Sequence, residues 1–294
     1  MKKIVRLTLL CIVILLSGTT LLQAQTKGLL WQITGKGIKQ PTYLYGTVHL
    51  FDTSLYRIPQ PVMAKLAQTK QVYFELDFGK MDPMEVMGYA MVKDSTQYLD
   101  KLLDTASLRK LKELVKTSPM MQMMGPALYR LKPLFLTSLL LNNGKAITID
   151  MEMYKRAKEL KDSVGGLETV AEQMQALDAI TLTSQAKMMQ DYLKTYTSAD
   201  ATIKKLTEIY VKQDIDNLLE QMNDDAPLDA AFNEALLIKR NVVMANRIDG
   251  LVGKTSTMIA VGAGHLGGPK GLITLLKQKG YQIKNVPFTF IKAH

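Results

Sequence analysis

Residue types that bind metals or form cross-links are scarce in this chain. Its 294 residues include one cysteine, Cys11, and three histidines. Cys11 lies in an N-terminal segment that we expect to be removed, so the mature chain would have no thiol. That absence excludes disulfide bonds, thiolate metal ligands and a cysteine nucleophile. Long apolar runs are also missing after the N-terminus, since no later stretch approaches the roughly 18–20 residues of a membrane-spanning helix.

The N-terminus has the features of a secretory signal. Lys2, Lys3 and Arg6 precede an apolar run at residues 7–16, and Ala24 offers a small residue for cleavage. The run is shorter than a membrane span, which favours a cleaved signal over the alternative of an uncleaved anchor. We therefore predict that residues 1–24 are a signal peptide. The mature protein would be exported to the periplasm or secreted, with no stable transmembrane segment.

Positive charge exceeds negative charge, with a formal net charge of +10. The lysines are scattered beside glutamates and aspartates without long runs, which indicates solvated helix faces rather than a nucleic-acid surface. We predict a peptide or a small molecule as the substrate, and no nucleic-acid partner. The sequence does not indicate an oligomeric state.

Strand patterns occur at the two ends of the expected mature chain, residues 25–294. The predicted strands are residues 29–33, 42–45, 71–78, 257–261 and 281–286. The first two are joined by a Gly/Pro turn, which predicts a hairpin. Helices are expected at residues 62–68 and from Pro269, which can serve as a first helical residue.

Apolar residues at helical spacing fill the section between these strands. They predict helices at residues 102–115, 131–141, 153–160, 174–182, 188–196, 206–222 and 232–248. The predicted fold class is α/β, with a mixed sheet assembled from N- and C-terminal segments, flanked by helices, and a large helical middle section. Residues 25–294 would form a single domain whose helical lobe covers about residues 84–250.

Methionines recur at helical spacing at Met84, Met87 and Met91, and cluster at residues 120–124. Such side chains fill core gaps or form adaptable apolar grooves, and they also bind soft metals. We predict core packing for the stripe. For the cluster, which lies between a proline and a Gly-Pro pair, a mobile lid is the alternative.

Two internal histidines share one signature, Gly-x-x-His. His49 closes the sequence GTVH and His265 closes GAGH, and each signature follows a predicted strand. The carboxyl end of a strand in an α/β sheet is the usual place for a ligand. Taken singly, each motif is more simply a structural turn. Because the two hold the only internal histidines, we predict that both contribute to one site.

Glu75 interrupts an apolar strand pattern, where an ionised carboxylate is costly unless it is paired or liganded. Asp77 has the same strand parity, so it would face the same side. Two histidines and a glutamate form a known ligand set for hydrolytic metals. We therefore take His49, His265 and Glu75 as the candidate metal ligands.

These residues give the chain a family resemblance. GTVHL, the FELD strand, a segment from Asp150 that ends in GGLET, an Arg-Asn pair at residues 240–241 and GAGHLGGPKGLITLLKQKGY resemble the TraB–PrgY–GumN family, which includes the Tiki proteins. The resemblance covers residues 29–288. It departs from the family where Asp162–Gly165 replace the usual glycine-lysine before GLET.

The resemblance implies a mixed α/β core like that of erythromycin-esterase-like and ChaN-like proteins. Tiki members are membrane-tethered metalloproteases that depend on manganese or cobalt, and their two GxxH histidines and a glutamate are essential. Carried over, these roles fall on His49, His265 and Glu75, with manganese, cobalt or zinc as the expected divalent cofactor.

Four further positions complete the predicted site. Arg240 would position the substrate, because a guanidinium can clamp a carboxylate or peptide terminus in bidentate fashion. Asn241, Glu168 and Gly264 are predicted to bind substrate beside it, and Glu168 is also a candidate to orient Arg240. The alternative for each polar residue is a helix cap or a surface ion pair.

Three functions remain open from the sequence. The first is an exported, peptidase-like, metal-dependent hydrolase with His49, Glu75, His265 and Arg240 as catalytic residues. There, Glu75 is either a ligand or the general base. The second is a metal-free, esterase-like hydrolase that uses a histidine and a carboxylate. The third is a protein that binds a peptide, haem or metal without turnover, or that regulates.

Overall fold

The structure is a computed structural model that describes residues 27–142, 144–222 and 230–293. The predicted signal peptide, residues 1–24, lies outside these ranges. Six strands form one mixed sheet in the order β4-β3-β5-β2-β1-β6. They are β1 (Leu30–Thr34), β2 (Thr42–Thr47), β3 (Gln71–Leu76), β4 (Ser163–Glu168), β5 (Thr257–Gly262) and β6 (Gln282–Asn285).

The four strands β4, β3, β5 and β2 run parallel, so their carboxyl ends lie at one edge of the sheet. β1 is antiparallel to both of its neighbours, β2 and β6, which confirms the predicted hairpin of β1 and β2. The predicted α/β fold class with a mixed sheet is also confirmed. β4, however, comes from the middle of the chain, and its sequence SVGGLE gave no strand signal because glycine disfavours strands.

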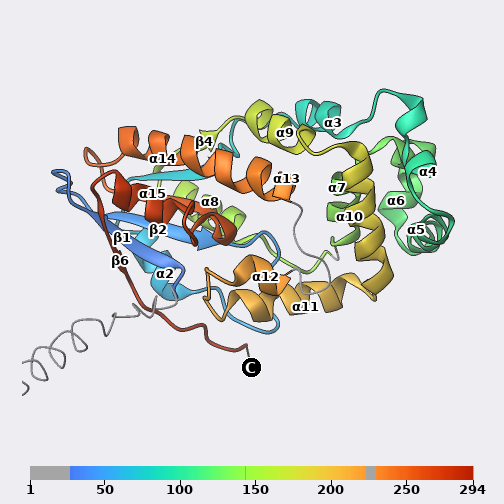
Figure 1. The fold of residues 1–294 in the computed structure, drawn as a ribbon. Coiled ribbons are helices and arrows are strands. Elements are labelled where there is room, and N and C mark those ends of the chain that lie inside the picture. Colours follow the sequence, from blue (N-terminus) through green and yellow to red (C-terminus); the bar gives the residue numbers. More distant parts are fainter. Residues whose placement is uncertain (1–26, 143, 223–229, 294) are drawn as a thin grey trace, which may run out of the picture.

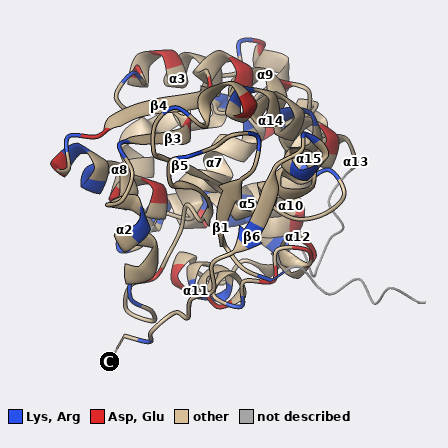
Figure 2. Ribbon diagram, turned by 90° about the vertical axis from the view of Figure 1, so that its left-hand side faces the viewer, with Lys and Arg blue, Asp and Glu red and all other residues tan. Residues whose placement is uncertain are grey.

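Helices cover both faces of the sheet (Figure 2). One face carries α2 (Gln60–Leu66) and α8 (Ile149–Glu159), and the other carries α14 (Lys239–Leu251) and α15 (Leu272–Gln278). This two-sided cover explains why β5 is apolar and buried along nearly its whole length. Lysines and arginines are interspersed with acidic residues along α8 (Figure 2).

A helical lobe extends to one side of the sheet (Figure 1). Its helices are α3 (Pro83–Ala90), α4 (Leu99–Leu102), α5 (Thr105–Thr117), α6 (Pro119–Met124), α7 (Pro133–Leu140), α9 (Val170–Asp178) and α10 (Leu182–Thr195). Two helices, α11 (Ala199–Tyr210) and α12 (Leu218–Met222), then lead back towards the sheet. The lobe has a hydrophobic cluster of its own, built around Leu99, Leu111 and Leu136 and separate from the core around the sheet.

The last long helical segment is interrupted. α13 (Ala230–Asn233) continues into a π-helical turn, η3 (Glu234–Ile238), and then into α14. π-Helical turns are rare and are often found next to functional sites. Within the described ranges, no helix is apolar and long enough to cross a bilayer.

Two local expectations are wrong in whole or in part. Met84 and Met87 are 78 % and 47 % exposed, because α3 buries only its last residue, Ala90, whereas Met91 packs against the hydrophobic cluster of the lobe as predicted. Pro269 does not open a helix, since α15 begins at Leu272. The amide of Gly271 donates to the Gly268 carbonyl at 3.1 Å and closes a tight turn there first.

Candidate functional site

The candidate site follows the carboxyl edge of the four parallel strands. Glu168 ends β4 and Glu75 is the penultimate residue of β3. Gly262 ends β5, and the short 3-10 helix η4 (Ala263–His265) follows it directly. Thr47 ends β2 and pairs with Gly262 in register, so both GxxH motifs leave the sheet from neighbouring strands. Although the two motifs lie far apart in the sequence, the parallel pairing of β2 with β5 brings them together.

Glu75 is nearly buried, with 11 % of its side chain exposed, and both of its oxygens accept hydrogen bonds. Oε1 accepts from the amide of Gly262 at 2.7 Å, and Oε2 accepts from Nη2 of Arg240 at 2.6 Å and from Nε2 of Gln173 at 3.0 Å. Burial by itself raises the pKa of Glu75, but protonated His265, Arg240 and the Gly262 amide oppose it and bring that pKa to about 2. Glu75 is therefore ionised at neutral pH.

Arg240 joins two carboxylates from adjacent strands. Its Nε donates to both oxygens of Glu168 at 3.0 and 3.1 Å, and its Nη2 donates to Glu168 at 2.6 Å as well as to Glu75. Its Nη1 donates to the carbonyl of Leu236 in the π-helical turn. Burial keeps the pKa of Glu168 above its usual value despite the guanidinium. The guanidinium thus holds the acidic side of the site together in a nearly buried cluster.

His265 is buried and fixed in orientation by Asn241, the residue after Arg240. Its Nδ1 lies 2.6 Å from Oδ1 of Asn241, whose Nδ2 donates to the carbonyl of Lys270. The imidazole therefore carries its proton on Nδ1 and turns Nε2 towards Oε1 of Glu75, at 3.6 Å. Burial lowers the pKa of His265 to about 4. Because His265 is then neutral at pH 7, the charges that keep Glu75 ionised there come from Arg240 and His49.

His49 is more open, with 66 % of its side chain exposed, and it is held by Asp150 at the start of α8. Its Nδ1 lies 3.1 Å from Oδ2 of Asp150. Desolvation lowers the pKa of His49, but the hydrogen bond and charge of Asp150 outweigh it and raise that pKa to about 9. The charge of Glu75 raises the pKa of His49 and the charge of Arg240 lowers it, so His49 is electrostatically coupled to both residues.

The donor chemistry of this edge fits a divalent metal. Both imidazoles bond through Nδ1 to a buried acceptor, the arrangement that leaves Nε2 to a metal and sets the tautomer of metal-ligating histidines. In the described part of the chain, however, no group of three or more His, Cys, Asp or Glu side chains is already arranged to hold a metal ion. His49, His265 and Glu75 are the residues that would supply the ligands.

The four residues predicted to bind substrate lie at three places. Arg240 and Glu168 lie in the acidic cluster, and Asn241 contacts His265 from within the core. Gly264 packs beneath Leu219 of α12, since a Cβ on this glycine would lie 3.1 Å from that side chain. Substrate binding by these four residues stays a prediction.

Asp77 does not join the site. The chain leaves strand geometry after β3, and the Asp77 carboxylate instead accepts from the amide of Gly79 and pairs with Lys80. The expectation from strand parity is therefore wrong, because parity holds only while the strand continues.

Sequence reasoning missed three partners of the predicted residues. Asp150 binds His49, Thr47 donates to Asp150, and Gln173 on α9 donates to Glu75. Gln173 carries no distinguishing signal in the sequence. For Asp150 a signal exists, because an acidic residue between Ile149 and Met153 in an apolar helix face has to be paired if it is buried.

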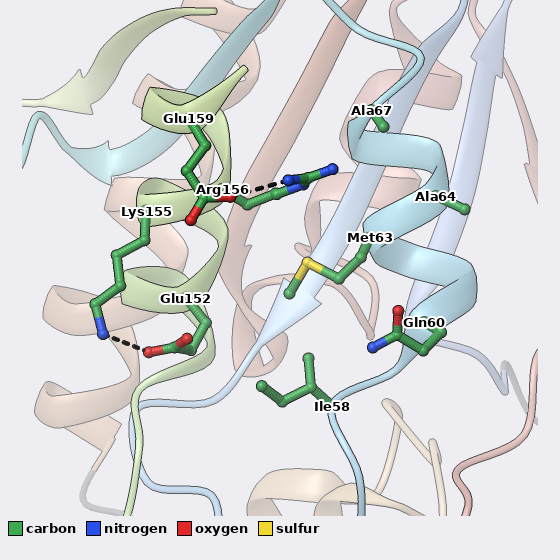
Figure 3. Close-up of a pocket in the computed structure, with 9 residues that line it drawn as sticks. All are labelled: Ile58, Gln60, Met63, Ala64, Ala67, Glu152, Lys155, Arg156 and Glu159. Carbon is green, nitrogen blue, oxygen red and sulfur yellow. Dashed lines mark hydrogen bonds and ion pairs between the residues drawn. The ribbon is translucent and has the colours of Figure 1, made fainter. Parts of the chain in front are cut away.

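A groove of about 540 Å³ lies on the α2 and α8 side of the sheet (Figure 3). Its charged side chains already pair along α8, Lys155 with Glu152 and Arg156 with Glu159. Met63 reaches into the groove from α2 (Figure 3). Neither internal histidine lines this groove, so it is distinct from the candidate site.

Comparison with known proteins identifies the family to which the chain is similar. Residues 29–285 match the model of the TraB/PrgY/gumN family. Among curated proteins, the chain is 24 % identical to Metalloprotease TIKI1 of Xenopus tropicalis, with 90 % of this chain and 63 % of that protein aligned. Metalloprotease TIKI2 of Danio rerio is 24 % identical, with 90 % and 62 % aligned, and Metalloprotease TIKI1 of Homo sapiens is 21 % identical, with 90 % and 63 % aligned. The chain thus spans less than two thirds of these relatives' lengths, and no solved structure matches it.

Proposed function

This chain belongs to the TraB/PrgY/gumN family, and we propose that it is a metal-dependent hydrolase of the peptidase type. The observation that carries the proposal is the pairing of the two GxxH motifs. Their histidines leave adjacent parallel strands, and both are bound through Nδ1. The likeness to proteins named metalloproteases supports the same chemistry.

His49 and His265 would hold the metal through Nε2, with Glu75 as the third ligand. A bound divalent ion would lower the pKa of a water molecule and polarise the carbonyl of the substrate. The pKa of Glu75, lowered to about 2, favours a ligand or charged anchor over a general base, because a general base works best with a pKa near the working pH.

Arg240 keeps Glu75 ionised and fixed in position. It binds Glu75 and Glu168 at once, so Glu75 turns its remaining Oε1 lone pair towards His265. This clamp supports a role for Arg240 in positioning the carboxylate, beside the predicted contact with substrate. Export through the N-terminal signal remains part of the proposal, and it would place the site outside the cytoplasm.

Metal binding by the purified protein tests the proposal. Elemental analysis and calorimetry with Mn²⁺, Co²⁺ and Zn²⁺ should give one ion per chain, and both His49→Ala and His265→Ala should abolish binding while the fold persists. His294→Ala is the matched control, because it removes the remaining histidine of the chain. Affinity should rise as the pH approaches 9, since a proton on His49 competes with the metal.

A peptide-cleavage screen with the bound ion then tests the reaction class. Cleavage that stops with a chelator and returns with the metal supports the proposal. If the wild-type protein binds each ion no more tightly than the two histidine variants, the metal-dependent mechanism is wrong.

The pair of His265 and Glu75, 3.6 Å apart, favours a second candidate. A neutral imidazole beside a fixed carboxylate can activate a water molecule without a metal. Hydrolysis that survives thorough EDTA treatment and is lost in His265→Ala would select this candidate.

A further inference from the structure

We propose that Asp150 is a positioning residue that fixes the ring of His49 for ligand binding. The proposal rests on the proposed function, in which His49 holds a metal through Nε2. It assigns a role to a buried carboxylate that faces the site from α8, a helix on the opposite face of the sheet from Arg240 and Asn241.

The geometry of Asp150 shows a carboxylate used at both oxygens. It is 2 % exposed. Oδ1 accepts from the hydroxyl of Thr47 at 2.6 Å, and Oδ2 faces Nδ1 of His49 at 3.1 Å. Thr47 therefore orients the carboxylate, and the carboxylate orients the imidazole. With both oxygens engaged and buried, Asp150 is suited to support a ligand rather than to be one.

The backbone around Asp150 is tied to the same turn. The amide of Ile149 donates to the carbonyl of Val48 at 3.1 Å, and the hydroxyl of Thr148 donates to the carbonyl of His49 at 3.1 Å. The start of α8 is thus fastened to the GTVH motif by main-chain and side-chain contacts. His49 needs this support, because an exposed imidazole otherwise loses rotamer freedom when it binds a ligand.

Helix capping does not explain the carboxylate. α8 has no side-chain hydrogen bond at its N-cap, Thr148, and the side-chain contacts of Asp150 go to β2 and the turn after it. A carboxylate in the first turn is favourable for the helix dipole, but this effect is small. Such a small gain would be available to an exposed residue as well, so it does not account for burial.

His265, the buried histidine, is held in the same way as His49, but by an amide instead of a carboxylate. Asn241 accepts from Nδ1 of His265 at 2.6 Å, so a neutral amide serves the buried ring and a carboxylate serves the exposed ring. Both acceptors come from helices and both bind Nδ1, which leaves Nε2 of each ring for a ligand. In known metal sites, loss of such outer partners weakens metal affinity by about 10–100-fold.

Manganese affinity is the first readout. Calorimetry with Mn²⁺ on the full chain should show Asp150→Ala weaker than wild type by about 10–100-fold, and Asp150→Asn should lie between them because an amide oxygen can still accept. The matched control is Asp162→Asn, which alters a buried carboxyl just beyond α8 whose Oδ2 has no hydrogen-bond partner in the described residues. The control should bind Mn²⁺ like wild type.

The second readout is the histidine tautomer, which does not depend on metal. With only three histidines, ¹⁵N-histidine labelling gives an assignable spectrum, recorded at pH 10, above the pKa of His49 of about 9. Wild type should show the Nδ1–H form at His49 and at His265. Asp150→Ala should shift His49 towards the Nε2–H form and leave His265 unchanged. If Asp150→Ala does not fold by circular dichroism, Thr47→Val combined with Asp150→Asn takes its place.

The two readouts separate the possible failures. Wild-type tautomers and wild-type Mn²⁺ affinity in Asp150→Ala would overturn the positioning role. If wild type binds none of Mn²⁺, Co²⁺ or Zn²⁺, the proposed function fails, and the tautomer alone decides whether Asp150 fixes His49. An equal loss of affinity in Asp162→Asn would also count against Asp150, because the effect would then not be specific to the carboxylate that binds His49.

Discussion

Replacing Arg240 with methionine should destabilise the protein strongly at neutral pH. The substitution leaves Glu75 and Glu168 buried, adjacent and without their shared cation. Removal of one partner from a buried ion pair typically costs about 3–5 kcal/mol. Burial raises the pKa of Glu75, and His265, Arg240, His49 and the Gly262 amide together lower it to about 2, so Arg240 supplies part of the stabilisation of this buried charge.

The loss should depend on pH in a defined direction. In wild type the folded pKa of Glu75 lies below its unfolded value, so its stabilisation is present above pH 4.5 and is lost as the pH falls towards 2. Loss of Arg240 removes one of the groups that oppose burial, so the pKa of Glu75 should rise, and burial already raises that of Glu168. Both carboxyls can then be protonated in the folded variant, so the difference from wild type should shrink between pH 7 and pH 4.

Urea denaturation followed by circular dichroism at pH 7 and pH 4 measures both effects. Arg247→Met is the matched control, because Arg247 lies on the same helix and pairs with Glu172 where both side chains are 38 % exposed. An exposed pair is worth ~0–1 kcal/mol. If Arg240→Met costs no more than Arg247→Met at pH 7, the buried clamp is not a stabilising unit and the reasoning is refuted.

Three further variants test the packing around the site by the same denaturation assay. Gly46→Ala should cost about 1–3 kcal/mol, because its Cβ would lie 3.0 Å from the backbone of Ala263, whereas Gly250→Ala, with open space around its Cβ, should be neutral or stabilising. Tyr210→Phe should cost about 1–3 kcal/mol, since its buried hydroxyl donates to the Gly46 carbonyl at 2.7 Å; an unchanged midpoint would contradict this. Asp162→Asn should stabilise at pH 7 by up to ~1 kcal/mol, because burial raises the pKa of Asp162 above 3.8 in the folded state. That gain should vanish as the pH falls below 3.8, and a gain that persists there would show another cause.

The position of the two GxxH motifs at the carboxyl edge of the sheet could be predicted, because it depends on local sequence patterns. Apolar runs followed by glycine-rich turns placed the two GxxH motifs at strand ends, and the structure puts β2 and β5 side by side. Glu75 was recognisable because a carboxylate in an apolar strand needs a partner. Strand order itself came from long-range pairing, which no local pattern encodes.

The residues that contact Glu75 and Arg240 could not be predicted from the sequence, because these contacts also depend on long-range pairing. Glu168 reaches Arg240 because β4 pairs with β3, and β4 was hidden by its two glycines. Gln173 reaches Glu75 from the first turn of the next helix, α9, whose N-cap Thr169 forms a capping box with Glu172. Each contact depends on the docking of an element rather than on its own pattern.

The start of α14 contacts both the glutamates and the buried histidine of the site. Arg240 and Asn241 are consecutive, and in an α-helix consecutive side chains point about 100° apart. They nevertheless serve neighbouring strands, since Arg240 reaches Glu75 and Glu168 on β3 and β4 and Asn241 reaches His265 after β5. The π-helical turn before them lets Nη1 of Arg240 bond to the Leu236 carbonyl, which directs the guanidinium. The same helix thus sets the charge of Glu75 and the tautomer of His265, so a shift of α14 would alter both together.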